Sequence, residues 1–296
     1  MSAELTDRVR LWQGRGAREH HRGHGIHVFR RDGEGPLLLL LHGFPSSSYD
    51  WRLLLDELQG PPVLAFDFLG FGLSDKPREH RYGLGWQADL AGELVRRHAD
   101  GRPVFIVAHD MGTSVATEIM ARDLEGTLGW ELGGALLFNG SIVLEAATLT
   151  PSQKLLRGPL GPLAARLSSR RVFDQQFGSL FSAEHPLDRA EADDQWSLIC
   201  HNGGRTLAHR LVHYLDERVA LADRWHGAIR DWQGLQLAWG LEDPVATTAV
   251  LAALRDLHPG VPVAELPGLG HYPQIEAPAR MAAVVAGAVA AAPATG

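Results

Sequence analysis

The chain has 296 residues, enough for one large domain or a core with an insertion, and its 45% apolar content argues against disorder. A net charge of −7 and a pI near 6.1 argue against nucleic acid or an anionic membrane as the partner. The single cysteine, Cys200, excludes an intrachain disulfide and fits a reducing compartment. We find no signal-peptide core near residue 1 and no convincing membrane span, so we expect a cytoplasmic protein without stable membrane insertion.

The first third of the chain predicts strands alternating with helices. Residues 8–32 alternate loosely, and residues 25–29 favour an early strand paired with one before it. Five consecutive leucines at 37–41 predict a strand buried on both faces, as in a parallel sheet. The next elements are expected as a helix near 49–58, a strand at 62–67 and a helix at 82–98. No G-x-G-x-x-G lies at a strand-to-helix junction, so we expect no dinucleotide binding. No cofactor is expected.

The stretch Val107-Ala-His-Asp-Met-Gly112 is the strongest functional signal in the chain. A buried strand at 103–107 leads into it, and a helical pattern at 113–122 follows. The layout small-x-acid-x-Gly is that of a nucleophile elbow, with Asp110 where the commoner version carries Ser. Such a turn presents Asp110 at the N-terminus of the next helix, where a carboxylate stays ionised. An Asp that only caps the helix is the alternative.

After a short buried strand at 135–138 the alternation stops. Residues 142–229 contain several amphipathic patterns and aromatics such as Phe181, Trp196, Tyr214 and Trp225, and they predict a helical cap inserted after the sixth strand. Alternation resumes at 235–266 with a strand, a helix and a strand, and a last helix begins near residue 277. The order predicts an α/β fold with a mostly parallel eight-stranded sheet, a core made of 1–141 and 230–296, and active-site residues at strand ends.

Two further strand ends carry the partners that a nucleophile needs. Asp243 follows the strand at 235–239, and His271 follows the strand at 263–266, between glycines. Nucleophile, acid and His therefore occur in the chain order that this layout requires. The turn at 42–45 can direct the Phe44 N–H at the elbow, and Met111 N–H opens the helix, so the two predict an oxyanion hole.

Taken together, HGFP, DFLGFGLSD, AHDMG, LEDP and GHYPQIEAP resemble the α/β-hydrolase fold, and among its branches the epoxide hydrolase and haloalkane dehalogenase group, which has an Asp nucleophile. A narrower resemblance, in LLFNGSI, TPSQKLL, GPLGPLAARL and the stretch from Tyr214 to Trp225, is to the mesoderm-specific transcript hydrolases. The group implies Asp110 as nucleophile, His271 as base and Asp243 as the partner of His271. It also implies an ester between Asp110 and substrate that water then hydrolyses.

The leaving group separates the two enzyme types. Dehalogenases of this group bind halide through a Trp after the nucleophile and often an Asn after His-Gly, whereas this chain has Met111 and Phe44 there. Epoxide hydrolases use one or two cap tyrosines as acids, and Tyr214 resembles one of them. The resemblance therefore favours an epoxide hydrolase-like enzyme, with haloalkane dehalogenase as the alternative.

A ligand-binding protein with little or no activity remains the alternative of another class. The expected substrate is a small apolar electrophile that reacts with water, and the expected state is a monomer or homodimer. The remaining candidates for the wall of the substrate pocket are His109, Trp196, Phe177 and Tyr272. Four histidines between residues 20 and 27 match no closed ligand set, so no metal site is expected.

Overall fold

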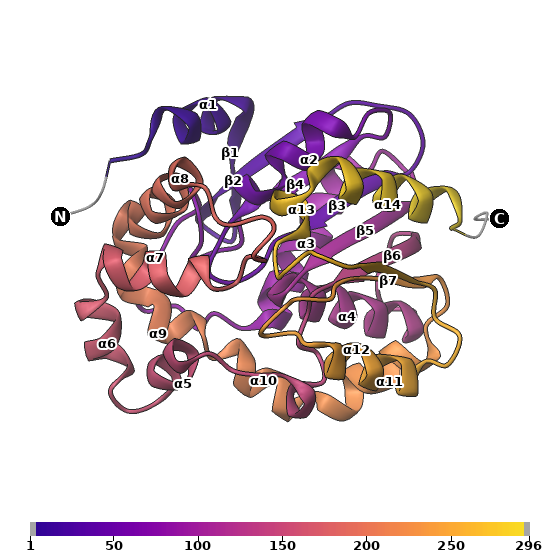
Figure 1. Ribbon diagram of the computed structural model, residues 1–296. Helices are drawn as coiled ribbons and strands as arrows, with labels where there is room; N and C mark the ends of the chain where they lie inside the picture. Colours follow the sequence, from indigo (N-terminus) through magenta and orange to yellow (C-terminus); the bar gives the residue numbers. More distant parts are fainter. Residues whose placement is uncertain (1–3, 293–296) are drawn as a thin grey trace.

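One eight-stranded sheet forms the centre of the protein, and the computed structural model describes residues 4–292 (Figure 1). The strand order is β1-β2-β4-β3-β5-β6-β7-β8. β1 and β2 pair antiparallel, as do β2 and β4, and every other pair is parallel. The strands are β1 Gly16–His21, β2 His24–Arg31, β3 Leu37–Leu41, β4 Val63–Phe66, β5 Val104–His109, β6 Leu132–Phe138, β7 Leu235–Gly240 and β8 Val263–Leu266. The predicted fold class is confirmed.

Helices cover both faces of the sheet because its central strands are apolar on both sides. In β3, Leu37, Leu39 and Leu41 pack into one layer and the two leucines between them pack into the other. The first layer lies under α3 Leu84–His98, α4 Met111–Leu124, α11 Ala222–Asp231 and α12 Thr248–Leu257. The second lies under α1 Asp7–Arg15, the short η1 Ser48–Trp51, α2 Arg52–Glu57 and α14 Pro278–Ala290.

The sheet reverses its order of growth at β3, which lies between β4 and β5. Connections leave the carboxyl ends of β3 and β5 toward opposite faces, and the space between such connections is where open α/β sheets bind ligands. In this protein the loop after β3 carries Phe44 and the turn after β5 carries Asp110.

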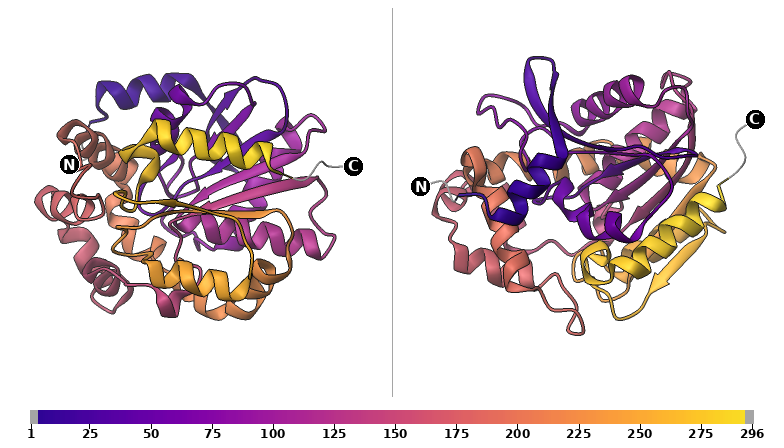
Figure 2. Two further views of the ribbon diagram at one scale, coloured as in Figure 1. Left: turned by 45° about the vertical axis from the view of Figure 1, so that its right-hand side comes forward. Right: turned by 90° about the horizontal axis from the view of Figure 1, so that it is seen from above.

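The insertion after β6 is helical, as the sequence predicts. It contains η2 Leu144–Ala146, α5 Pro151–Arg157, α6 Gly161–Leu167, α7 Arg170–Gly178, α8 Arg189–Cys200, η3 His201–Leu207, α9 Ala208–Leu211 and α10 Tyr214–Ala220. Figures 1 and 2 show α5 to α9 grouped at one end of the sheet. The expected boundary at residue 229 falls inside α11, which packs along α4, where Trp225 Nε1 donates to Glu118 Oε2 at 3.0 Å. This last helix of the expected cap therefore lies against the core.

One element near the N-terminal end differs from the sequence prediction, whereas the last helix agrees with it. Residues 7–15, expected within a loosely alternating segment, form α1, because the hydroxyl of Thr6 accepts from Val9 N–H and Val9 and Trp12 are buried on one side. The last helix, α14, begins at Pro278, as expected near residue 277, and the short helix α13 Pro273–Glu276 precedes it.

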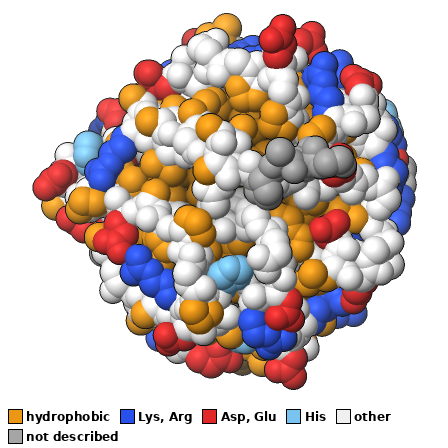
Figure 3. Space-filling model, turned by 90° about the vertical axis from the view of Figure 1, so that its right-hand side faces the viewer, with side chains coloured by type: hydrophobic (Ala, Val, Ile, Leu, Met, Phe, Trp, Pro, Cys, Tyr) orange, Lys and Arg blue, Asp and Glu red, His pale blue; other side chains and the backbone are white. Residues whose placement is uncertain are grey.

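The end of the molecule opposite the cap has hydrophobic side chains over much of its centre and charged side chains around its rim (Figure 3). Within residues 4–292, no helix is long and apolar enough to cross a membrane.

Candidate active site

Asp110 lies in a sharp turn between β5 and α4. Its φ of 44° and ψ of −111° are sparsely populated for a residue with a side chain, which indicates local strain. The turn is possible because its neighbours are small: a Cβ on Gly112 would come within 2.3 Å of the Leu41 carbonyl oxygen. A Cβ on Gly43 would come within 2.7 Å of the Asp110 Cβ. Glycine at both positions lets the elbow approach the end of β3.

The carboxylate of Asp110 is buried and receives a backbone hydrogen bond. Phe44 N–H donates to Asp110 Oδ2 at 2.9 Å. The turn at 42–45 therefore directs the Phe44 N–H at the elbow. Met111 is the first residue of α4, and no hydrogen bond within the described chain joins its N–H to that carboxylate.

A buried arginine that the sequence analysis did not select lies beside the elbow. Arg218 Nη2 donates to the Asp110 carbonyl oxygen at 3.0 Å and lies 3.9 Å from Asp110 Oδ1. Its Nε donates to Ser114 Oγ at 2.8 Å. Since Arg218 is 1% exposed, its charge is compensated mainly by Asp110. The spacing Tyr214-x-x-x-Arg218 was the available signal, because it places both side chains on one face of α10.

His271 and Asp243 form a buried pair at the ends of β8 and β7. His271 Nδ1 lies 2.7 Å from Asp243 Oδ2. Burial lowers the pKa of His271, but the charge and hydrogen bond of Asp243 outweigh burial, and the charge of Asp110 adds to them, so that this pKa lies above its ordinary value. The neighbouring Glu242 is exposed. The structure therefore pairs His271 with Asp243 and not with Glu242.

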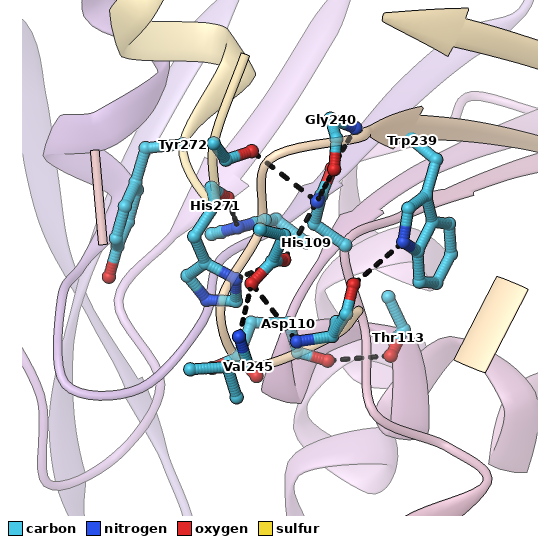
Figure 4. Close-up of polar contacts among 12 residues, drawn as sticks. His109, Asp110, Thr113, Trp239, Gly240, Val245, His271 and Tyr272 are labelled. Carbon is cyan, nitrogen blue, oxygen red and sulfur yellow. Dashed lines mark hydrogen bonds and ion pairs between the residues drawn. The ribbon is translucent and has the colours of Figure 1, made fainter. Parts of the chain in front are cut away.

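Asn139 orders the carboxylate of Asp243, a role that the sequence did not reveal. Its Nδ2 donates to Asp243 Oδ2 at 2.7 Å, and its Oδ1 accepts from Gly240 N–H at 3.0 Å. The N–H groups of Val245 and Ala246 donate to Asp243 Oδ1 at 2.7 and 3.0 Å. Asp243 is thus held by donors from two strand ends, several of which Figure 4 shows.

His109 supports the loop of His271 from below. Its Nε2 lies 2.7 Å from the His271 carbonyl oxygen, and its Nδ1 lies 3.2 Å from Gln274 Nε2 (Figure 4 shows His109 next to His271). Burial lowers the pKa of His109 well below its ordinary value, so that this ring stays neutral. His109 is expected from the sequence at the pocket wall, whereas the structure places it beneath the His271 loop.

Glu276 joins the same loop to the cap. Its carboxylate accepts from Gly270 N–H at 2.9 Å and from Tyr272 N–H at 3.0 Å. It also accepts from Ser182 N–H of the insertion at 3.0 Å. His271 N–H in turn donates to the carbonyl oxygen of Leu180 at 2.9 Å. Glu276 and Leu180 therefore attach the loop of His271 to the chain segment after α7.

A cavity of about 90 Å³ connects Asp110 and His271 with the cap. Its size restricts an unstrained occupant to a small molecule. Mixed apolar and polar side chains line it, and several are amides or hydroxyls of the insertion. The lining residues are Phe44, Pro45, Asp110, Thr150, Ser152, Gln153, Phe173, Gln176, Phe177, Leu180, Val245 and His271.

The other aromatic candidates lie around this cavity at different depths. Phe177 lines it, and Tyr272 packs against Phe177 with ring centroids 5.1 Å apart. Trp196 packs against Phe173 at 5.4 Å, behind the lining layer. Tyr214 is buried under Phe44, with ring centroids 5.7 Å apart, and its hydroxyl accepts from Gln153 Nε2 at 3.4 Å. Trp196, Tyr272 and Tyr214 are therefore not themselves lining residues, although Tyr214 reaches the lining through Gln153.

No group of three or more His, Cys, Asp or Glu side chains in residues 4–292 is arranged to hold a metal ion. The four N-terminal histidines lie on and around the β1–β2 hairpin, where His21 packs against Trp86 with ring centroids 4.9 Å apart.

A strained elbow, an acid after β7 and a His after β8 under a helical insertion define an α/β hydrolase. The sequence profile of the alpha/beta hydrolase family matches residues 38–284, and the chain belongs to that family.

Among curated proteins, the chain is 57% identical over 254 residues to the candidate hydrolase LipZ of Mycobacterium tuberculosis, covering 85% of this chain and 88% of LipZ. It is 33% identical over 268 residues to the mouse mesoderm-specific transcript protein, covering 86% of this chain and 80% of that protein. The resemblance to the mesoderm-specific transcript hydrolases is thereby confirmed. The solved haloalkane dehalogenase DbeA from Bradyrhizobium elkani has a TM-score of 0.77 at 20% identity, covering 94% and 99% of the two chains, and shares the fold.

Proposed function

We propose that the protein is a hydrolase whose nucleophile is the carboxylate of Asp110. The single observation that carries the proposal is the cavity that Asp110 and His271 both line. The Nδ1 atom of His271 is paired with Asp243, which does not line the cavity. An ionised carboxylate needs no base in order to attack a saturated carbon. The first step therefore breaks a carbon–heteroatom bond of the substrate and forms an ester of Asp110.

In the second step, His271 removes a proton from water, and the resulting hydroxide attacks the ester carbonyl of Asp110. The raised pKa of His271 suits a base that becomes a cation next to Asp243. Phe44 N–H, which donates to the carboxylate in the free protein, stabilises the oxyanion, and Met111 N–H is the second proposed donor. Collapse of this intermediate releases the alcohol and restores Asp110.

The most suitable substrate class is a small apolar epoxide. Opening an epoxide leaves an alkoxide that must be protonated, and Tyr214 is the proposed donor. Burial, followed by the charge of Asp110, raises the pKa of Tyr214, so that its hydroxyl remains protonated. The polar cavity wall also contains Gln153, whose amide contacts the Tyr214 hydroxyl. Haloalkane dehalogenation is the second candidate, favoured by the fold shared with DbeA.

Trapping the ester tests the nucleophile without knowledge of the best substrate. His271→Ala should still react once with an epoxide but fail to release product, and mass spectrometry should find the adduct on the peptide that contains Asp110. Asp110→Ala is the matched control and should give no adduct. In a single turnover in water labelled with heavy oxygen, the label should enter Asp110 and leave the first product unlabelled.

Labelled product in that first turnover would show that water attacks the substrate directly and that Asp110 acts as a base. Tight binding of epoxides without turnover or adduct would identify a ligand-binding protein. Halide release faster than diol formation, across a panel of haloalkanes and epoxides, would favour the dehalogenase.

A further inference from the structure

The outer surface of the cap concentrates the exposed large apolar side chains of the protein. Eight such side chains are exposed in the described residues, and five of them lie between residues 155 and 172. Those five are Leu155 (49% exposed), Leu160 (60%), Leu163 (54%), Leu167 (70%) and Val172 (44%). Scattered exposed leucines are ordinary, but a cluster of this kind on a single subdomain indicates a contact surface.

The cluster is ordered along α6. Leu160, Leu163 and Leu167, which we call the α6 leucines, follow the spacing i, i+3, i+7 and therefore lie on one side of the helix. On its other side, α6 buries Gly161 and Ala165 against the rest of the cap. The exposed stripe is thus the outer face of a packed helix.

The charge of the same segment is opposite to that of the whole chain. Residues 146–173 contain five basic residues and no acidic residue, in a protein with a net charge of −7. Three of the five are exposed and form no ion pair or side-chain hydrogen bond within the described structure. These three, which we call the free basic residues, are Lys154, Arg166 and Arg171.

From this combination we propose that the outer face of α5 to α7 binds the surface of an anionic lipid membrane. Leucines beside lysine and arginine are the composition that lets a short helix lie in the headgroup region, with apolar side chains below and cations at the phosphates. The net charge of the whole chain predicts no such partner. Electrostatic attraction between exposed charges acts only within about a Debye length, so the charge of the contacting face determines whether an anionic surface is attracted. The binding is peripheral and reversible.

Two observations favour a membrane over a second copy of the chain. A symmetric dimer through this face would bring the free basic residues of both copies together, and that repulsion opposes association. The same helices also form the cavity wall from their inner sides, through Gln153 of α5 and Phe177 of α7. A face that borders the cavity and contacts lipid would receive apolar molecules that are dissolved in the membrane.

The test is flotation of the full-length protein with vesicles, and it requires no substrate and no activity. Vesicles made of equal parts phosphatidylcholine and phosphatidylglycerol are compared with vesicles of phosphatidylcholine alone. We expect binding to the anionic vesicles, weaker binding to the neutral ones, and release by high salt. The salt titration uses the unaltered chain, so it does not depend on the folding of any variant.

Two triple variants then separate the apolar and the charged contributions. Changing the α6 leucines to Ser should weaken binding at least tenfold. Changing the free basic residues to Gln should weaken it about a hundredfold, because each cation near an anionic surface contributes about fivefold. Matched control variants carry the same changes on the core at exposed positions: Leu11→Ser with Leu124→Ser, and Arg78→Gln with Arg96→Gln and Arg102→Gln.

The controls should bind as the unaltered protein does, and all variants should keep its melting temperature because the altered side chains are exposed. Absence of binding to both kinds of vesicle would overturn the proposal, as would variants of the outer face that bind like the controls. Sedimentation that shows dimers lost with the α6 leucines, without vesicle binding, would assign the face to a second copy.

Discussion

The loop of His271 and the outer face of the cap represent two opposite ways of using side chains. Around His271, buried polar groups have hydrogen-bond partners. The carboxylate of Asp243, for example, accepts from four donors: His271, Asn139, Val245 and Ala246. On α5 to α7, apolar side chains are exposed, and the free basic residues Lys154, Arg166 and Arg171 have no partner within the described chain. The first arrangement fixes one geometry, and the second leaves a surface whose stabilising contacts are outside the protein.

The comparison shows where this protein tolerates change. A buried hydrogen-bond network loses function when one member is removed, because the remaining groups are left unsatisfied. An exposed apolar stripe can be altered with little effect on folding, since its side chains are already in water. Substitutions at the network should therefore affect chemistry, and substitutions on the outer cap should affect binding to partners alone.

The largest effect should come from Asp243→Asn. Loss of the carboxylate removes the group that orients His271 and supports its positive charge, so we expect a fall of about a thousandfold or more in hydrolysis of the ester. The pKa of His271, now raised, should fall with it. Because His271 must be neutral to act as a base, the acid limb of the rate of ester hydrolysis should move to lower pH.

Rapid-quench measurement of the ester across pH would check both effects. The matched control is Glu242→Gln, one residue earlier and exposed, which should leave rate and pH profile unchanged. Equal loss in the two variants would mean that the network around Asp243 does not control the chemistry.

A smaller effect is expected for Tyr214→Phe. Removal of the hydroxyl deprives the opened epoxide of its proton donor, and we expect the first step to slow about a hundredfold. Single-turnover formation of the adduct would measure it. Tyr82→Phe is the control, because Tyr82 is also buried but donates to the Pro77 carbonyl oxygen away from Asp110. An unchanged alkylation rate in the Tyr214 variant would exclude Tyr214 as the proton donor. Gln153 would then be the neighbouring cavity residue to alter next.

Arg218→Met should cost about tenfold in the first step. The change removes the donor to the Asp110 carbonyl oxygen and the nearby positive charge. Without that hydrogen bond and charge the elbow is held less firmly in position for attack, so single-turnover formation of the adduct should slow while substrate binding changes little. Arg224→Met is the control, since Arg224 pairs with Glu118 and Glu125 on the flank of α4. An unchanged rate of adduct formation would show that Arg218 has only a packing role.

The smallest effect should appear in stability, at the junction of the core and the cap. Asp50 is buried, accepts from Gln195 Nε2 of α8 at 2.7 Å, and burial raises its pKa to about 7. The folded protein therefore binds a proton that the unfolded chain releases above its ordinary carboxyl pKa, so stability should decrease as pH rises from about 4 to 7. Asp50→Asn should remove this part of the pH dependence, shifting the melting temperature by a few degrees.

Melting curves at several pH values would show it, with Asp56→Asn as an exposed control in the next helix. Parallel pH dependence in Asp50→Asn and the unaltered protein would indicate that Asp50 is ionised when folded.

Much of the fold follows from local patterns, because the central strands are continuous apolar runs, and Asp110, Asp243 and His271 each lie in the turn or loop after one of them. Asp110, Asp243 and His271 could be selected in this way, since parallel strands bring their carboxyl ends to one edge. The contacts of Arg218 could not be predicted from the sequence, because an arginine on a cap helix is ordinarily exposed. Only the packing of α10 on the elbow buries this side chain.

Asn139 was missed for a different reason. It follows β6 with a φ of 47°, and that backbone turns its side chain toward Asp243 on the neighbouring strand end. A sequence shows an Asn after a strand but not which neighbour it faces. The helix α1 was also missed, since its apolar spacing is short and its stability depends on packing against β2, where Trp12 stacks on Phe29 at 4.7 Å.

The attachment of the His271 loop to Leu180 and Ser182 has a consequence for the order of events in one turnover. If the segment after α7 moves outward to admit substrate, the hydrogen bond from His271 N–H to Leu180 breaks, and Glu276 loses Ser182. The base is then least well oriented at the moment when bulk water enters. Return of the segment after α7 would restore the bonds at Leu180 and Ser182 and close the cavity at the same time. With such a movement, entry of substrate and activation of water would exclude each other, because the backbone bonds that orient His271 form only when the cavity is closed.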